Sequence, residues 1–148
     1  MAKPFSLQTV LELMQTRTDE ATRQLATLLA AEQDAQRKLA MLQHYRDEYF
    51  ARFRSAAQNG LRPADWRNYQ DFLDRLDEAI LQQQQVLGLQ KSHTAAGQAE
   101  WRRQHGKLKA IDALAERHWA SEARRDQKQE QKEQDAFAAR RNDDEPAL

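Results

Sequence analysis

The sequence predicts an all-α fold, a long two-helix antiparallel coiled-coil hairpin with an overhanging second helix. Two runs of mainly apolar residues repeat at alternating intervals of four and three residues, which is the period of a coiled-coil seam. Neither run contains proline, whereas residues 59–65 between them hold both a glycine and a proline. A further charged segment follows the second run, beyond the reach of the first. We therefore expect a single coiled-coil hairpin over residues 1–148.

The first helix is expected at about residues 5–58. At 1.5 Å per residue, about 50 residues give a rod of roughly 75 Å. Polar side chains occupy three positions of its seam, at Thr18, Glu32 and Arg46. The seam positions are Leu7, Leu11, Met14, Thr18, Ala21, Leu25, Leu28, Glu32, Ala35, Leu39, Leu42, Arg46, Tyr49 and Phe53.

A turn is expected at about residues 59–64, because Gly60 can adopt a positive φ and Pro63 cannot continue a preceding helix. The second helix then covers about residues 65–139, and about 70 residues correspond to roughly 105 Å. The tail at about residues 140–148 is expected to be disordered. The seam of the second helix is Tyr69, Leu73, Leu76, Ile80, Gln83, Leu87, Gln90, Thr94, Gly97, Trp101, Gln104, Leu108, Ile111 and Ala115.

The two seams predict the register of the hairpin. An antiparallel pair brings position a of one helix opposite position d of the other, and here each layer pairs two residues whose numbers sum to 122. Phe53 then meets Tyr69 at the turn end of the seam. Gly97 leaves Leu25 against bare backbone, which makes that layer weak.

Two seam residues have no polar partner in this register. Arg46 falls opposite Leu76, and Gln83 falls opposite Leu39. We expect both long side chains to extend from the seam towards water.

Composition excludes several classes of function. The chain has 23 basic and 23 acidic residues, which argues against binding nucleic acid through phosphate neutralisation. It contains no cysteine, so thiolate chemistry and disulfides are absent. No apolar stretch approaches the roughly 20 residues that span a bilayer, and no secretory signal is visible. The sequence therefore predicts a cytoplasmic protein without direct membrane insertion.

No catalytic, cofactor-binding or metal site is predicted. The four histidines, at positions 44, 93, 105 and 118, lie too far apart to form a ligand cluster. His44 with Asp47 or Glu48 has helical spacing, but two ligands do not make a site. The chain also lacks a phosphate-binding glycine loop and a nucleophile with a neighbouring base. We expect that the protein is not an enzyme and needs no cofactor.

The segment from about residue 121 onwards is charged and extends beyond the first helix. It holds almost nothing apolar before Phe137. One interpretation is a frayed single helix supported by charge pairs four residues apart, each contributing only a few tenths of a kcal/mol. The other is a partner-binding end.

Aromatic residues gather near the turn. Tyr45, Phe50, Trp66 and Phe72 lie off the seam, so two helices cannot bury all of them. They either pack locally over the turn or form an interface with a partner.

Residues 39–49, 66–72 and 131–138 resemble the flagellar export protein FliJ family. The resemblance covers the whole chain, and residues near the turn carry most of its specificity. It implies a non-enzymatic stalk and adaptor, and a general chaperone, of the flagellar type III protein export apparatus. It also implies a location at the cytoplasmic face of the inner membrane and a role in flagellum biogenesis, motility and chemotaxis.

The resemblance implies three partners: the flagellar export ATPase hexamer, the transmembrane export gate protein and the export chaperones. Three gate candidates, Leu42, Tyr49 and Leu76, also lie on the predicted seam. The full gate-binding set that it implies is Leu42, Tyr45, Tyr49, Phe72, Leu76 and Ala79. For the ATPase ring, the candidates are Leu7, Leu11, Arg124, Arg125 and Lys128.

Two alternatives remain at this point. A purely structural coiled-coil spacer or self-associating scaffold would tolerate loss of Tyr45 and Phe72. A membrane-surface or nucleic-acid binder is disfavoured by the zero net charge and by the mixture of both charges on each face.

Overall fold

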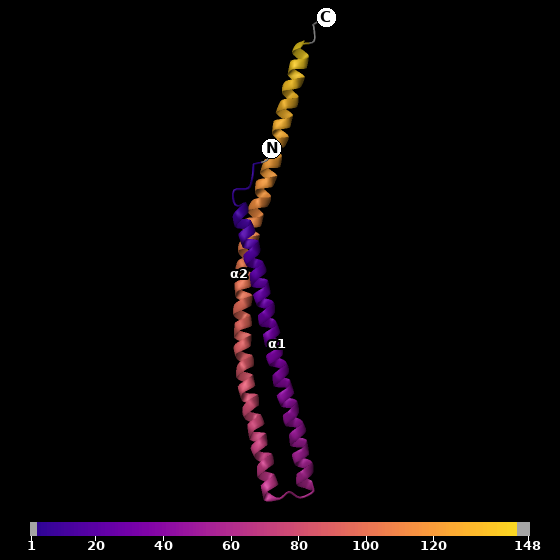
Figure 1. Cartoon of the computed structure of the whole chain (residues 1–148). Coiled ribbons are helices and arrows are strands. Elements are labelled where there is room, and N and C mark those ends of the chain that lie inside the picture. The colour runs from indigo at the N-terminus through magenta and orange to yellow at the C-terminus, as the bar shows by residue number, and fades with distance from the viewer. Residues whose placement is uncertain (1–2, 145–148) are drawn as a thin grey trace. The chain divides into compact units, whose positions relative to one another are not determined.

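The computed structural model describes residues 3–144, which form two helices and no strand. Helix α1 spans Gln8–Gln58 and helix α2 spans Pro63–Asp144 (Figure 1). The helices pack against each other in opposite directions, which confirms the predicted all-α hairpin. The described chain divides into two compact units. We call Glu20–Arg102 the hairpin unit, and residues 3–19 with residues 103–144 the terminal unit.

The helices are joined by a short connection in the hairpin unit. Gly60 has a φ of 85°, in the left-handed region that glycine adopts readily. The backbone N–H groups of Asn59 and Gly60 donate to the carbonyl oxygens of Ala56 and Ala57, at 3.2 and 3.3 Å, and close the last turn of α1. Helix α2 begins at Pro63, where the missing N–H would have had no helical partner.

Contacts in the hairpin unit confirm the predicted register. The rings of Phe53 and Tyr69 lie 5.5 Å apart between centroids. The hydroxyl of Thr94 donates to the carbonyl oxygen of Leu28 at 3.4 Å, and these two residue numbers also sum to 122. The same hydroxyl lies closer to the carbonyl oxygen of Gln90, at 3.0 Å one turn earlier in α2, so the buried Thr94 has acceptors both within its own helix and across the seam.

The two polar seam residues behave differently from each other. Arg46 reaches the exposed flank, as predicted, and its Nε donates to Oδ1 of Asp77. Gln83 turns towards α1 and is half-buried. Its Nε2 instead donates to the carbonyl oxygen of Ala35 at 3.0 Å in a partly buried position. The prediction for Gln83 was wrong because the small side chain of Ala35 leaves backbone accessible to a partner across the seam.

Apolar packing in the terminal unit involves one residue that the heptad pattern does not include. Phe5, Leu11 and Ala115 are buried in one cluster, and Leu7, Leu108 and Ile111 pack against it. The first helix was expected from about residue 5, but α1 begins at Gln8. Phe5 lies before the start of α1 and packs against α2. Burial of its ring stabilises this segment although the segment is not helical.

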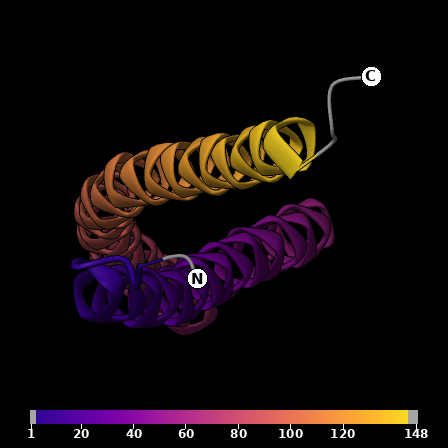
Figure 2. The same cartoon turned by 90° about the horizontal axis from the view of Figure 1, so that it is seen from above.

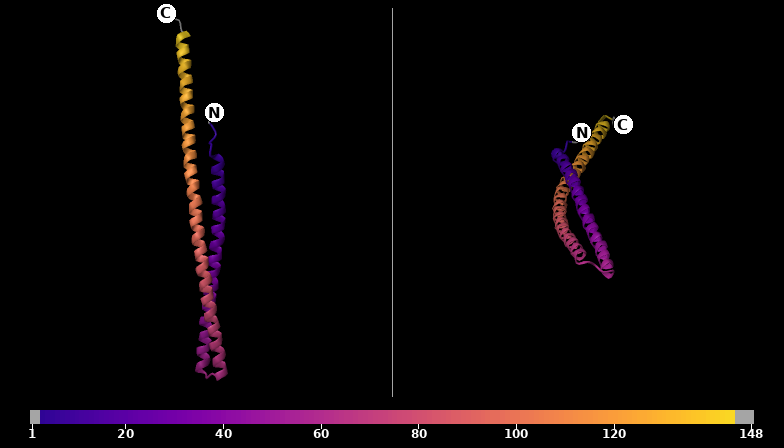
Figure 3. Two further views of the ribbon diagram at one scale, coloured as in Figure 1. Left: turned by 90° about the vertical axis from the view of Figure 1, so that its left-hand side faces the viewer. Right: turned by 60° about the horizontal axis from the view of Figure 1, so that its bottom comes forward.

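Helix α2 continues beyond the start of α1 as a single helix. Its C-terminal part is the yellow segment of Figure 2, and Figure 3 shows it extending past the start of α1 within the terminal unit. A disordered tail was expected at residues 140–148, yet residues 140–144 are helical. Arg140 and Asp144 have the four-residue spacing that supports a helix. The remaining residues of that expected tail, 145–148, lie outside the described part.

Within residues 3–144, neither helix has the length of apolar sequence that crossing a bilayer requires.

Candidate functional site

A groove in the hairpin unit brings together four of the six residues proposed for gate binding. Tyr45 and Tyr49 reach it from α1, and Phe72 and Leu76 from α2. Its volume is about 260 Å³. Tyr45 is 50% exposed and Phe72 is 42% exposed, so the groove offers large aromatic surfaces to solvent. The two helices thus form a shallow, aromatic-lined concavity of the kind that accepts a partner side chain.

Aromatic contacts hold this groove in shape. The ring of Tyr49 lies 4.2 Å from that of Phe72 and 5.3 Å from that of Tyr69, measured between centroids. Tyr49 is half-buried and therefore supports Phe72 from beneath. Aromatic pairs at such distances add about 0.5 to 1.5 kcal/mol beyond area burial. Phe72 is consequently presented to solvent in a supported position.

The other two gate candidates do not line the groove. Leu42 and Ala79 are both half-buried in the hairpin unit. Leu42 occupies the seam, as the heptad pattern predicted. Leu42 can therefore affect gate binding only through its packing in the seam.

Two charged residues of the groove were not predicted to belong to a partner-binding surface. Glu48 and Arg52 line it beside the aromatic side chains. Glu48 also lies 3.2 Å from Nε2 of His44, one helical turn away. Both groove charges lie on the flank of α1 next to the seam, and extending the heptad pattern to flanking positions would have identified them.

An exposed ion pair lies on the hairpin unit. The hydrogen bond to Asp77, and then the charge of that carboxylate, raise the pKa of Arg46 above its ordinary value. The side chains of Arg46 and Asp77 are 37% and 51% exposed. Solvent screens such a pair, so it contributes little to stability.

Aromatic residues nearer the turn support both earlier interpretations. Trp66 packs on Phe53 with ring centroids 4.9 Å apart, yet it remains 50% exposed. Phe50 lies 6.2 Å from Phe53 and is also exposed. These side chains pack locally and still present apolar surface.

The residues proposed for ring binding have different surroundings in the terminal unit. Leu11 is buried and Leu7 packs against its cluster. Arg124 and Lys128 instead lie along one exposed face of α2, four residues apart. Arg125 turns towards Glu122, with Nη1 to Oε1 at 3.4 Å. Arg124 and Lys128 are therefore the most available of the ring candidates.

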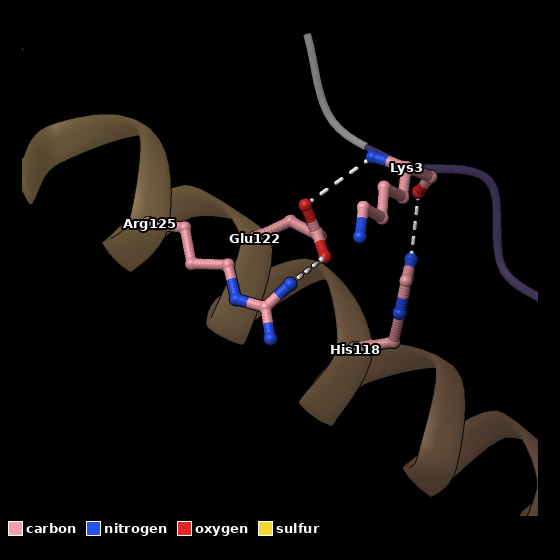
Figure 4. Close-up of polar contacts among 4 residues, drawn as sticks. All are labelled: Lys3, His118, Glu122 and Arg125. Carbon is pink, nitrogen blue, oxygen red and sulfur yellow. Dashed lines mark hydrogen bonds and ion pairs between the residues drawn. The ribbon is translucent and has the colours of Figure 1, made fainter. Parts of the chain in front are cut away.

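The N-terminal segment is fastened to α2 by a cluster that the sequence did not predict. The backbone N–H of Lys3 donates to Oε2 of Glu122 at 3.2 Å, and Nε2 of His118 donates to the carbonyl oxygen of Lys3 at 2.8 Å (Figure 4). Phe5 stacks on His118 with ring centroids 5.4 Å apart. Glu122 is only 6% exposed, and its buried carboxylate accepts from the N–H of Lys3 and from Arg125. Continuing the heptad pattern beyond Ala115 would have identified His118 and Glu122, the two α2 residues that contact the N-terminal segment.

These surfaces are suited to binding. No group of three or more His, Asp or Glu side chains that could hold a metal ion occurs in residues 3–144. The large exposed side chains are aromatic at the groove and charged along the end of α2.

Comparison with known proteins gives matches along nearly the whole chain. Residues 3–144 match the family model described as Flagellar FliJ protein. A relative named Flagellar FliJ protein from Salmonella typhi is 30% identical over 140 residues, which are 95% of this chain and 95% of the relative. A protein of the same name from Escherichia coli strain K12 has the same identity and coverage. The similarity therefore includes both compact units.

Proposed function

This chain belongs to the flagellar FliJ protein family, and from this premise we propose that it is a non-enzymatic stalk and adaptor of the flagellar type III protein export apparatus. Membership supports a role in flagellar protein export and flagellum biogenesis. In the proposed role the chain couples the export ATPase ring to the transmembrane export gate. It also escorts export chaperones. It acts by binding and needs no cofactor.

The observation that carries this proposal is the groove lined by Tyr45, Tyr49, Phe72 and Leu76. Exposed aromatic side chains beside charged residues form an apolar centre with a polar rim, which is the usual anatomy of a protein interface. Tyrosine is also among the residues that contribute most to binding when a partner covers it. We assign this groove to the gate.

The end of α2 supports a second contact, with the ATPase ring. Arg124, Lys128 and Lys132 line one face of a helical segment that has no neighbouring helix within the terminal unit. A helix that is polar on all sides gains little from packing within its own chain. Leu7 and Leu11 contribute by packing near Ala115 of α2, ahead of this exposed end.

The proposed location is the cytoplasmic face of the inner membrane, reached through the export apparatus and without direct insertion. The balanced charge of the chain fits protein partners better than nucleic acid.

The test uses Tyr45→Ala and Phe72→Ala in the full-length protein, with binding to the cytoplasmic part of the export gate as readout. Leu81→Ala is the matched control, because Leu81 is a 58% exposed apolar residue of α2 outside the groove. We expect each groove variant to weaken binding by about tenfold or more, the effect of removing an interface hot spot. Gate binding that is unchanged in both groove variants would refute the gate assignment. A structural spacer, the second candidate, predicts that result.

A further inference from the structure

Helix α1 carries a second heptad stripe on an exposed face of the hairpin unit. The stripe repeats at intervals of four and three residues beside the buried seam. Two of its members, Met41 and Tyr45, are large apolar side chains that are 48% and 50% exposed. A stripe of this period on an exposed face is suited to packing against another helix. Its members are Ala31, Asp34, Lys38, Met41, Tyr45, Glu48, Arg52 and Ser55.

The charges in this stripe are complementary to those of the same stripe read in the opposite direction. In an antiparallel pair, facing residues have numbers with a constant sum, and a sum of 86 places Asp34 opposite Arg52. The same sum places Lys38 opposite Glu48. Each pairing occurs twice in a two-fold symmetric arrangement, so four opposite-charge pairs form.

The uncharged positions fit the same sum. Met41 falls opposite Tyr45 in the two central layers, and Ala31 falls opposite Ser55 in the outermost layers. A flexible thioether packs favourably on an aromatic ring. Small side chains at both ends allow the helices to approach closely. The stripe therefore combines an apolar centre with a charged rim.

We propose that a second copy of this chain docks on this stripe, with the two α1 helices antiparallel and a two-fold axis at the level of residue 43. The paired layers from Asp34 to Arg52 cover 18 residue steps, or roughly 27 Å of helix. Both copies use the same surface, so the interface is isologous and closes at two copies.

The charged residues are available for these pairs. Within residues 3–144, Asp34, Lys38 and Arg52 have no ion-pair partner, and the contact of Glu48 is with the exposed ring of His44. All four are exposed. Charge pairs that a second copy shields from water contribute more to binding than pairs on an open surface.

Helix α2 adds apolar surface at both ends of the stripe. Lys38 lines a groove of about 240 Å³ together with Val86, which is 45% exposed. Arg52 lines the gate groove together with Phe72. The stems of both basic side chains thus lie beside apolar groups that a second copy would cover.

The dimer would also regulate the proposed gate contact, a consequence that rests on the function proposed above. Tyr45 belongs to both surfaces, so a second copy and the gate cannot occupy it together. The dimer would be a stored form, and gate binding would require dissociation.

Charge reversal in the full-length protein tests the dimer by sedimentation equilibrium. Lys38→Glu alone and Glu48→Lys alone each replace two opposite-charge pairs with like-charge pairs. We expect each variant to weaken self-association by about tenfold to a hundredfold. An equimolar mixture of the two variants restores both pairs between unlike chains, and the double variant restores them between like chains. Both should recover dimer formation.

The matched control is Arg37→Glu, which reverses an adjacent exposed charge outside the stripe. It should leave self-association unchanged, and circular dichroism should show equal helicity in all variants. Wild-type protein that remains monomeric throughout the concentration range overturns the proposal. So does a dimer that Lys38→Glu leaves intact, or a mixture that fails to restore it.

Crosslinking gives an independent test, because the chain contains no cysteine. A mixture of Met41→Cys and Tyr45→Cys chains should form a mixed disulfide faster than an otherwise equal mixture with Arg37→Cys in place of Tyr45→Cys. Equal rates would contradict the docking geometry. Gate binding by monomeric Lys38→Glu protein separates the two proposals, because it would support the gate assignment whatever the outcome for the dimer.

Discussion

Leu28 packs directly against the backbone of Gly97 in the hairpin unit. A Cβ atom placed on Gly97 would lie 2.6 Å from Cδ1 of Leu28 and 3.6 Å from Cδ1 of Leu25. The predicted register pairs Leu25 with Gly97, whereas Leu28 is the nearer side chain in the structure. A methyl group at Gly97 would therefore require the side chain of Leu28 to move.

Gly97→Ala should therefore raise the free energy of unfolding less than Gly88→Ala does, although alanine is the better helix former at both positions, because Leu28 must move to admit the methyl group. Overpacking a tight seam costs about 1 kcal/mol or more, which offsets the gain of about 1 kcal/mol from helix propensity. Gly88→Ala is the matched variant, because no atom lies within 4 Å of a Cβ placed there. It should raise stability. Urea denaturation compares the two, and equal changes of the same sign would contradict this account of the seam.

Loss of Phe5 should release the N-terminal segment. Phe5→Ala removes a ring that is 8% exposed and stacks on His118. We expect a destabilisation of about 3 to 5 kcal/mol, limited to the terminal unit. Hydrogen exchange should become faster near residues 3–11 and remain unchanged near Phe53. Unaltered protection of the N-terminal residues would show that Phe5 does not hold this segment.

The ion pair of Arg46 and Asp77 should contribute little to the free energy of unfolding. Asp77→Asn should lower the free energy of unfolding by about 1 kcal/mol or less, because both side chains are largely exposed. The raised pKa of Arg46 means that its contribution is complete below the ordinary guanidinium pKa and is lost only as pH rises through the folded value. Stability should therefore show no titration of Arg46 between about pH 6 and pH 9. The measurement is the difference in free energy of unfolding between wild type and Asp77→Asn. A change in that difference between about pH 6 and pH 9 would contradict the expectation.

The heptad pattern predicted most of the fold because one apolar stripe per helix leaves few ways to bury it. Phe53 with Tyr69 and Thr94 with Leu28 confirm the register. The inward hydrogen bond of Gln83 could not be predicted, since it depends on a backbone carbonyl that becomes accessible only after the helices pack.

The candidate sites were predicted less completely than the fold. The resemblance supplied Tyr45 and Phe72, which the groove brings together. It did not supply Glu48 or Arg52, because flanking charges are usually interpreted as solvated. The N-terminal attachment involves backbone groups of Lys3, which carry no sequence signal.

Truncation should separate ring binding from folding. A chain that ends after Asp126 keeps the contacts among Lys3, Glu122 and Arg125 but loses the exposed end of α2. We expect normal thermal unfolding of the remaining protein and a loss of its binding to the export ATPase. Lys128→Glu in the full-length chain is the finer variant and should weaken this binding several-fold. Full ATPase binding by the truncated chain would move the ring contact elsewhere.

The most direct test of the coupling role is a bridging experiment. The cytoplasmic part of the export gate is fixed to a resin, and retention of the export ATPase is measured with and without this protein. The account predicts retention only when the protein is present, and loss of retention with Tyr45→Ala/Phe72→Ala while that variant still binds the ATPase. If the ATPase is retained equally without the protein, or with the groove variant, the chain does not couple the two partners through this groove.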